Sequence, residues 1–178
     1  ATARSVDFDG SDDYLELGDS SDLSPEDGDF TFECWIKPDA WTSGNWDIVY
    51  ANHISNGFFV GKDNAENFVI RSWANSNHIS TSNLPTIGQW THVAVTRSGS
   101  TLKLFYNGIL EKSVTDSYAF ATGDTRIGND TAGSTFEGSV SNLRFVKGTA
   151  VYTSSFRPPT EPLTNITNTS LLCCNDSS

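Results

Sequence analysis

The sequence predicts an all-β protein built as a two-sheet antiparallel sandwich. Two observations carry this prediction: apolar and polar residues alternate over short runs, and Gly, Asn, Asp and Pro separate these runs. No stretch shows a helical period longer than two turns. The chain has 178 residues, of which 37% are hydrophobic, enough for one domain with a real core. We therefore expect a single domain over residues 1–178.

The clearest predicted strand spans residues 29–37, where side chains alternate between two faces. One face carries Phe30, Phe32, Cys34 and Ile36, and the other carries Thr31, Glu33, Trp35 and Lys37. Because successive side chains of a strand point to opposite faces, this period of two indicates a half-buried strand. Pro38 ends the run, because proline cannot donate to a sheet ladder.

The other predicted strands share β-branched or aromatic residues bounded by turn residues. They cover residues 5–8, 14–17, 47–51, 57–62, 67–73, 90–97, 101–106, 109–114, 126–128 and 136–147. Asn107-Gly108 joins two of them as a hairpin, since a type I′ turn needs positive φ at both central residues. In the last run the apolar positions change phase between Val140 and Leu143. This change predicts a β-bulge at Ser141-Asn142.

The C-terminal segment differs in composition from the rest. Residues 149–178 are rich in Thr, Ser, Pro and Asn, and we expect them to form an extended strap lying on the sandwich. Leu171-Leu172 is expected to dock as a last short strand. The chain has three cysteines, and a bridge between Cys34 and Cys173 stays open as an alternative to free thiols.

The charge of the chain limits its partners. The net charge is -11, and this argues against nucleic acid, whose phosphates would be repelled. No run of eighteen apolar residues occurs, so we expect no membrane insertion. Ten of the 22 acidic residues lie within residues 1–30. They are either solvated loop residues or carboxylates that hold a hard cation such as Ca²⁺.

Four segments, in this order, resemble the laminin G-like and concanavalin A-like lectin/glucanase jelly rolls. They are the opening SVDFDG with Asp13-Tyr14-Leu15, the Trp-bearing strand FTFECWIKP, the hairpin WTHVAVTR with LFYNG, and the closing strand FEGSVSNLRF. The resemblance covers residues 5–147 and implies a concanavalin A-like jelly-roll sandwich. It implies function only loosely, because this sandwich hosts lectins, adhesion modules, glycosidases and lyases.

Two further expectations follow from resemblance. Relatives of this sandwich often hold a structural Ca²⁺ between the first and closing strands, which would bring Asp9, Asp12 and Asn142 together as ligands. The family usually carries Asp where this chain has Asn142, and turn capping is the alternative role of the aspartates. The tail from Gly148 to Leu172 is similar to repeats in virion and tail-fibre proteins of marine phages. It implies an extracellular or virion-surface location.

The patterns expected of an enzyme are absent. Glucanases of this fold carry Glu-x-Asp-x-x-Glu on one strand, and no such string occurs here. The nearest pair, Asp7 and Asp9, is short and precedes a turn. No Gly-x-Ser-x-Gly or metal-binding His motif is present, and His92 is expected to have a structural role inside its strand. We expect no enzyme activity and no catalytic residues.

Three of the five tryptophans lie where core packing does not explain them. Trp41 and Trp46 fall in a loop without core periodicity, and Trp73 ends a strand. Indole faces stack on the C–H faces of sugars, while polar neighbours bond the hydroxyls. The alternative is that these rings cap the open end of the sandwich. The expected ligand-binding residues are Trp41, Trp46, Tyr50, Asn52, Trp73, Asn75 and His78.

The sequence thus predicts a non-catalytic module that binds a glycan or cell-surface polysaccharide, as part of a viral or phage surface fibre. The first alternative is a structural or assembly domain of a larger surface protein, in which the strap packs on a second copy to form a homo-oligomer. The second alternative is a glycoside hydrolase or polysaccharide lyase.

Overall fold

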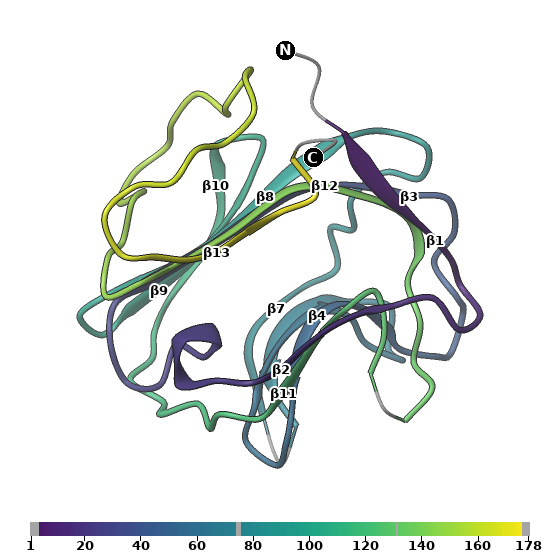
Figure 1. Cartoon of the computed structure of the whole chain (residues 1–178), viewed down its shortest axis with the longest axis horizontal. Helices are drawn as coiled ribbons and strands as arrows, with labels where there is room; N and C mark the ends of the chain where they lie inside the picture. The colour runs from purple at the N-terminus through teal and green to yellow at the C-terminus, as the bar shows by residue number, and fades with distance from the viewer. Residues whose placement is uncertain (1–3, 74–75, 131, 176–178) are drawn as a thin grey trace.

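The structure, a computed structural model, describes residues 4–73, 76–130 and 132–175, with the backbone alone at residues 76 and 77. Within these residues it contains thirteen strands in two antiparallel sheets and one short 3₁₀ turn, η1 (Ser21–Leu23). The sheets pack face to face (Figure 1). The predicted all-β sandwich is therefore confirmed.

Sheet A has seven strands. They are β1 (Ser5–Asp9), β3 (Phe30–Pro38), β8 (Thr91–Ser98), β9 (Thr101–Tyr106), β10 (Ile109–Thr115), β12 (Glu137–Lys147) and β13 (Thr169–Cys173). Their order is β1-β12-β3-β8-β9-β10. One long edge of β12 is shared, because β1 pairs with its first half and β13 with its second half.

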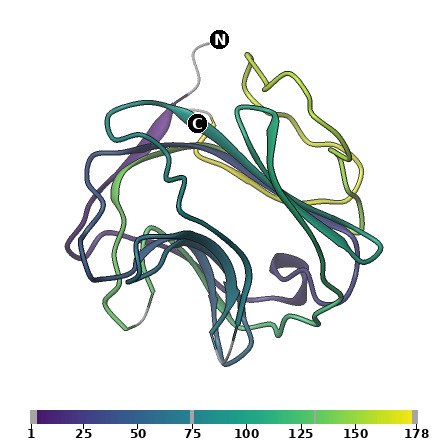
Figure 2. The same ribbon diagram turned by 180° about the vertical axis from the view of Figure 1, so that it is seen from behind.

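Sheet B has six strands. In spatial order they are β2 (Leu15–Asp19), β11 (Asp124–Ile127), β4 (Asp47–His53), β5 (Phe58–Lys62), β6 (Phe68–Ser72) and β7 (Ser76–Thr81). The sheet bends so that its hollow side faces away from sheet A (Figures 1 and 2). Strand β7 was not predicted, because its Ser- and Asn-rich sequence shows no apolar alternation.

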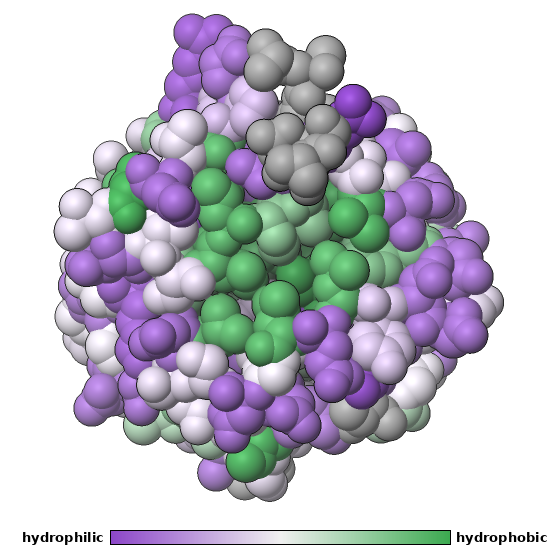
Figure 3. All heavy atoms as spheres, in the orientation of Figure 1, coloured by the Kyte–Doolittle hydropathy of each residue, from purple (hydrophilic) through white to green (hydrophobic). Residues whose placement is uncertain are grey.

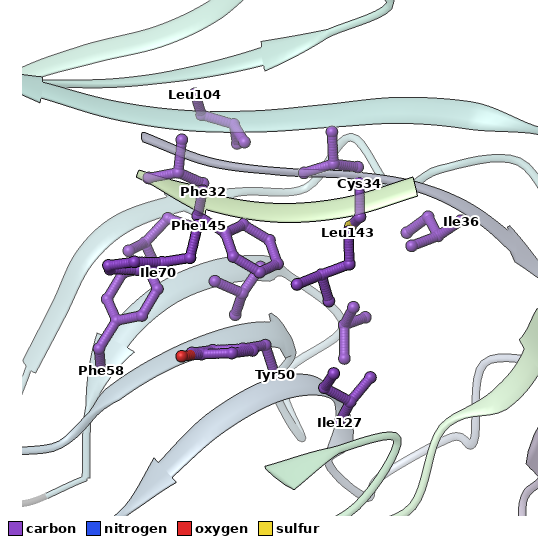
Figure 4. Close-up of a cluster of buried hydrophobic side chains, with 14 of the residues drawn as sticks. Phe32, Cys34, Ile36, Tyr50, Phe58, Ile70, Leu104, Ile127, Leu143 and Phe145 are labelled. Atoms are coloured by element: carbon purple, nitrogen blue, oxygen red, sulfur yellow. The ribbon is translucent and has the colours of Figure 1, made fainter. Parts of the chain in front are cut away.

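The core fills the space between the inner faces of the two sheets (Figure 4). The predicted inner face of β3 is confirmed, because all four of its expected core residues are fully buried. Phe30 meets Phe58 of sheet B edge to face at 5.4 Å, and Phe32 meets Tyr50 at 5.1 Å. Aromatic pairs of this kind stabilise a core beyond the area they bury.

The predicted bulge is present in β12. The pairing of β12 with β3 shifts between Ser141 and Arg144, and Asn142 has a φ of 50°. The shift lets both Val140 and Leu143 point into the core, as their change of phase required.

The predicted hairpin between β9 and β10 is also confirmed. Asn107 and Gly108 have φ values of 49° and 74°, the positive angles that a type I′ turn requires. Glycine is needed at position 108 for a second reason. A Cβ there would lie 1.9 Å from the carbonyl oxygen of Phe156, where the C-terminal segment passes.

Residues 149–168, here called the strap, cross the outer face of sheet A (Figure 1). Side-chain hydroxyls of the sheet donate to its backbone, Thr31 to the Thr149 carbonyl and Thr96 to the Tyr152 carbonyl, each at 2.9 Å. The Phe156 N–H donates to the Gly108 carbonyl at 2.9 Å. The strap therefore covers polar side chains that the alternation of β3 and β8 directs away from the core.

All three cysteines are free thiols in the structure. Cys34 is fully buried in the core, and burial raises the pKa of its thiol. The Sγ atoms of Cys173 and Cys174 lie 3.6 Å apart. The sequence left open a Cys34–Cys173 bridge or free thiols, and the structure has free thiols.

The flank between β1, β13 and β2 is apolar. Figure 3 shows hydrophobic side chains gathered between the two sheets and ringed by hydrophilic ones. Partly buried Val6, Leu15, Leu171 and Cys173 pack against the core.

Among the residues that the structure describes, no helix is long and apolar enough to cross a membrane.

Candidate functional site

The outer face of sheet B carries a second apolar cluster. Ile48 and Ala51 of β4, Phe59 of β5 and Val69 of β6 point away from the core and are nevertheless fully buried. They are covered by Trp46 and Trp73, which are only partly buried. An outward-facing sheet surface is usually polar. The two partly exposed indoles that top this apolar layer are therefore candidates for ligand contact.

We call the group of Trp46, His53, Phe59, Arg71 and Trp73 the aromatic platform. The ring centroids of Trp46 and Trp73 lie 6.4 Å apart, and Trp73 stacks on Phe59 at 5.4 Å with an interplanar angle of 11°. The Arg71 guanidinium carbon lies 5.0 Å from the centroid of the Trp46 ring, and His53 lies 6.0 Å from Trp73. The platform combines flat apolar faces with a cation that has several hydrogen-bond donors.

A buried ion pair fixes the loop that carries Trp46. Lys62 Nζ lies 3.1 Å from Asp47 Oδ2, and both side chains are fully buried. Lys62 also donates to the carbonyls of Thr42 and Asn45 at 2.7 and 3.0 Å. Burial raises the pKa of Asp47, although hydrogen bonds from Lys62 and Thr42 act in the opposite direction. These bonds hold Trp46 in place before any ligand arrives.

Strand geometry places Trp73. It follows Ser72, the last residue of β6, and continues the outward phase of Val69 and Arg71. Among the described residues, its buried indole Nε1 has no hydrogen-bond partner. Buried indole N–H groups usually find an acceptor. The flat, partly exposed indole of Trp73 suits a ligand with a flat C–H face.

Two predicted ligand-binding residues lie in the interior instead. Tyr50 and Asn52 are fully buried. The Tyr50 hydroxyl donates to the Leu23 carbonyl at 2.6 Å, and Asn52 Nδ2 donates to the same carbonyl at 3.0 Å. The expectation that they contact a ligand was wrong, because a register shift between Ile48 and Tyr50 directs both side chains to the inner face of the sheet. Burial also raises the pKa of Tyr50.

Trp41 is separated from the platform. It packs against Phe68 and Phe136 at centroid distances of 6.4 and 5.8 Å, at the end of the core. Its Nε1 donates to the Pro85 carbonyl at 2.9 Å. Capping the end of the sandwich, the alternative weighed from the sequence, describes Trp41. Trp46 and Trp73 are the two predicted tryptophans that the structure brings together.

His78 lies in β7, rather than in a loop. Its Nδ1 pairs with Asp116, its Nε2 lies 3.2 Å from the Ser72 hydroxyl, and its ring packs on Tyr118 at 4.5 Å. This order of Asp, His and Ser resembles a hydrolase triad, but Ser72 is fully buried and presents no nucleophile to a substrate. The predicted residue Asn75 lies outside the described residues.

The proposed metal ligands are only partly brought together. Carboxylate oxygens of Asp9, Asp12 and Asp13 lie within 4.8 Å of one another, and all three residues are exposed. Asp9 Oδ1 also accepts from the Ser11 N–H at 2.8 Å, as a turn-capping aspartate does. A set of three carboxylates suits Ca²⁺, which takes oxygen ligands.

Asn142 does not belong to that cluster. The pairing of β1 with β12 sets Asp9 opposite Glu137 and Ser5 opposite Ser141, so Asn142 lies beyond the other end of β1. Its Oδ1 accepts from the Leu163 N–H at 2.8 Å. The expectation of Asn142 as a ligand was wrong, because the bulge turns its side chain toward the strap.

The sequence did not single out the other three members of the platform. Phe59, Arg71 and His53 lie at outward positions of β5, β6 and β4. The alternation of β6, with Val69 and Arg71 on one phase and Phe68 and Ile70 on the other, carried a usable signal. It placed Arg71 on the same face as Trp73.

Residues 9–151 match the family model described as the concanavalin A-like lectin/glucanases superfamily. The chain belongs to this family. The resemblance drawn from the four sequence segments is thereby confirmed, while the likeness of the tail to phage fibre proteins stays a prediction.

Several solved structures share the fold. A putative carbohydrate binding protein from Bacteroides ovatus is 13% identical with a TM-score of 0.74, and the match covers 97% of this chain and 52% of that one. Domain 4 of an extracellular arabinanase from Geobacillus stearothermophilus, solved with arabinotriose, is 20% identical with a TM-score of 0.62, over 83% and 72% of the chains.

A heptameric pentraxin from Limulus polyphemus is also similar. It is 20% identical with a TM-score of 0.59, and the match covers 84% of this chain and 78% of the pentraxin. No curated protein matches the chain in sequence. At these identities the likenesses establish the fold, and the role of this chain has to be argued from its own side chains.

Proposed function

We propose that this chain is a non-catalytic carbohydrate-binding module whose aromatic platform binds a glycan. One observation carries the proposal. Trp46 and Trp73, which come from separate segments, meet with ring centroids 6.4 Å apart on the hollow outer face of sheet B. Arg71 lies over one ring and His53 beside the other.

Sugars match this surface chemically. A pyranose or furanose ring has a C–H face that packs on indole and a rim of hydroxyls that bond to polar side chains. Arg71 supplies donors for those hydroxyls. The buried ion pair of Lys62 and Asp47 fixes Trp46 before the ligand binds, so binding costs little conformational entropy.

Two of the similar structures support this choice of ligand. One is described as a putative carbohydrate binding protein, and another was solved with arabinotriose bound. The family also includes glucanases, and the non-catalytic part of the proposal rests on the missing Glu-x-Asp-x-x-Glu string. The burial of Ser72 supports it further.

The proposal includes an extracellular or virion-surface location, as a domain of a surface fibre, which the likeness of the tail implies. Assembly through the strap is the weaker alternative. The backbone carbonyls of the strap accept hydrogen bonds from sheet A of the same chain, including those from the side chains of Thr31, Thr96 and Lys103. A strap engaged within its own chain is poorly placed to join a second copy.

A glycan array with the full chain tests the proposal, followed by calorimetric titration of the best ligand. We expect Trp46→Ala and Trp73→Ala to weaken binding by about tenfold or more, because a lost stacking contact is worth about 0.5–1.5 kcal/mol beyond its buried area. Arg71→Gln, which leaves the apolar layer intact, should weaken it about threefold to tenfold.

The matched control is Tyr14→Ala, which removes an exposed aromatic ring outside the platform. It should leave the affinity of the platform ligand unchanged, and circular dichroism and melting temperature should show that each variant is folded. The proposal fails if the array shows no glycan binding with or without Ca²⁺. It also fails if folded Trp46→Ala, Trp73→Ala and Arg71→Gln all bind as the wild type does.

A further inference from the structure

A pocket opens on the outer face of sheet A, on the opposite side of the molecule from the platform. Its volume is about 440 Å³. It is lined by Trp35 of β3, Ser141 and Asn142 of β12, Trp90, and residues 4–5 and 159–161. We call this cavity the strap pocket, because residues 159–161 belong to the strap.

The sheet holds the first indole in place. Trp35 pairs across the strands with Ser141 of β12 and His92 of β8. Its ring meets the His92 ring edge to face at 5.3 Å, and His92 in turn lies 3.2 Å from Glu33. His92 and Glu33 are fully buried. Trp35 is therefore fixed by a rigid layer beneath it, as a binding-site residue should be.

The second indole is exposed. Trp90 directly precedes β8 and keeps 42% of its surface accessible, although tryptophan is on average a strongly buried residue. Among the described residues, neither Trp90 nor Trp35 belongs to either apolar cluster. Trp90 therefore presents an exposed indole surface to the pocket that it lines.

The polar groups of the pocket fall into two kinds. Ser141 and Asn142 are satisfied within the protein, since Asn142 donates to Ser141 and accepts from Leu163. In the part of the chain that the structure describes, the side chains of Arg4, Ser5, Thr160 and Glu161 show no hydrogen bond or ion pair. They are exposed on the lining. The pocket thus offers a donor cation, an acceptor anion and two hydroxyls.

We propose that the strap pocket binds a neutral mono- or disaccharide unit, as a second carbohydrate site independent of the platform. Its volume lies in the usual range for small-molecule sites, about 300–1,000 Å³. Sugar C–H faces would pack on Trp35 and Trp90, and hydroxyls would bond to Arg4 and Glu161. One positive and one negative side chain cancel, and the net charge of -11 opposes a polyanionic glycan, so a neutral sugar fits best.

The pocket is built partly from residues that lie outside the family match. The family match spans residues 9–151, while residues 4–5 and 159–161, which wall the pocket, lie outside it. Trp35 and Trp90 lie within the match, so the strap and the first strand turn a sheet surface into a cavity. The platform and the pocket lie on different sheets, so an experiment can reject one proposed site and leave the other standing.

The experiment titrates a panel of neutral sugars into the full chain by saturation-transfer NMR and calorimetry. The panel contains glucose, galactose, mannose, fucose and N-acetylglucosamine, with disaccharides of each. The variants are Trp90→Ala and Glu161→Gln in the pocket and Trp46→Ala on the platform. Trp90 and Glu161 are exposed, so neither change should disturb folding, which melting temperatures check.

We expect at least one panel sugar to bind the Trp46→Ala variant as tightly as the wild type. That affinity should fall about tenfold in Trp90→Ala and about threefold to tenfold in Glu161→Gln. The proposal is overturned if no panel sugar binds Trp46→Ala, or if both pocket variants bind like the wild type. Binding lost in Trp46→Ala but kept in Trp90→Ala would leave the platform proposal standing alone.

Discussion

Glu33 shows how a single residue ties the strap to the sandwich. It is fully buried on the outer face of β3, beneath the strap. Arg144 Nε donates to its Oε1 at 2.9 Å, and the Tyr152 hydroxyl donates to its Oε2 at 2.9 Å. Burial by itself would raise the pKa of Glu33, but the His92 hydrogen bond and the Arg144 charge outweigh it and lower the pKa.

Glu33→Gln should therefore destabilise the protein by about 3–5 kcal/mol at neutral pH, because it leaves Arg144 buried without its partner. A lowered folded pKa means that the ionised form stabilises the fold above the ordinary pKa of about 4.3. This contribution disappears as pH falls through the lowered value.

Urea unfolding measured from about pH 3 to about pH 8 checks the prediction. The gap between wild type and Glu33→Gln should be widest near neutrality and should narrow in acid. Glu161→Gln, an exposed Glu, is the control and should show no such gap. A constant gap across the whole pH range would contradict the assignment.

At the scale of elements, the bulge in β12 depends on Asn142. The residue adopts a φ of 50°, which asparagine tolerates better than most residues, and it accepts the Leu163 N–H at 2.8 Å. The bulge therefore has two effects: it reverses the phase of the side chains along β12, and it anchors the last part of the strap through Leu163.

Asn142→Ala should cost about 2–4 kcal/mol, because it combines positive-φ strain with an unpaired buried N–H of Leu163. Asn142→Asp keeps an acceptor for Leu163 and should cost less. Chemical denaturation of both variants is the measurement. Equal stability of Asn142→Ala and the wild type would show that neither the strain nor the bond matters.

Local patterns explain which elements the sequence could predict. Three features could be predicted because each depends on a short stretch of the chain: the alternation of β3, the Asn107-Gly108 turn and the phase change in β12. Trp41 and Trp46 could not be separated in this way, because they share one loop and differ only in tertiary packing. Tyr50 was misplaced because the β4 register shift leaves no mark in the sequence.

The burial of Glu33 was equally hidden. Its phase on β3 correctly directed it away from the core, and an outward Glu is normally solvated. The covering residue, Tyr152, lies 119 positions away in the chain. Composition identified the strap, but nothing in the sequence showed which side chains it would bury.

On the scale of the whole molecule, the two sheets present different aromatic surfaces. The platform lies on the hollow side of sheet B, and the strap pocket lies on the outer side of sheet A. A module with two such sites would be able to link two glycan chains. The acidic cluster of Asp9, Asp12 and Asp13 lies apart from both, at the turn after β1.

Calcium remains a prediction about the stability of the whole fold. If Ca²⁺ binds the acidic turn, a chelator should lower the melting temperature, since an ion held only by the native state stabilises it by about 2.7 kcal/mol at 100 times Kd. Asp12→Ala should abolish the difference between calcium and chelator. Identical melting curves for wild-type protein in excess calcium and in excess chelator would remove the ion from the account.

The most direct test of the central claim is ¹⁹F NMR of the full chain labelled with 5-fluorotryptophan. The five tryptophans report on three places: Trp46 and Trp73 on the platform, Trp35 and Trp90 on the strap pocket, and Trp41 on the end of the core. On addition of the best ligand from the glycan array, the signals of Trp46 and Trp73 should shift in a saturable way while that of Trp41 stays still. Unmoved Trp46 and Trp73 signals at saturating glycan would contradict the account.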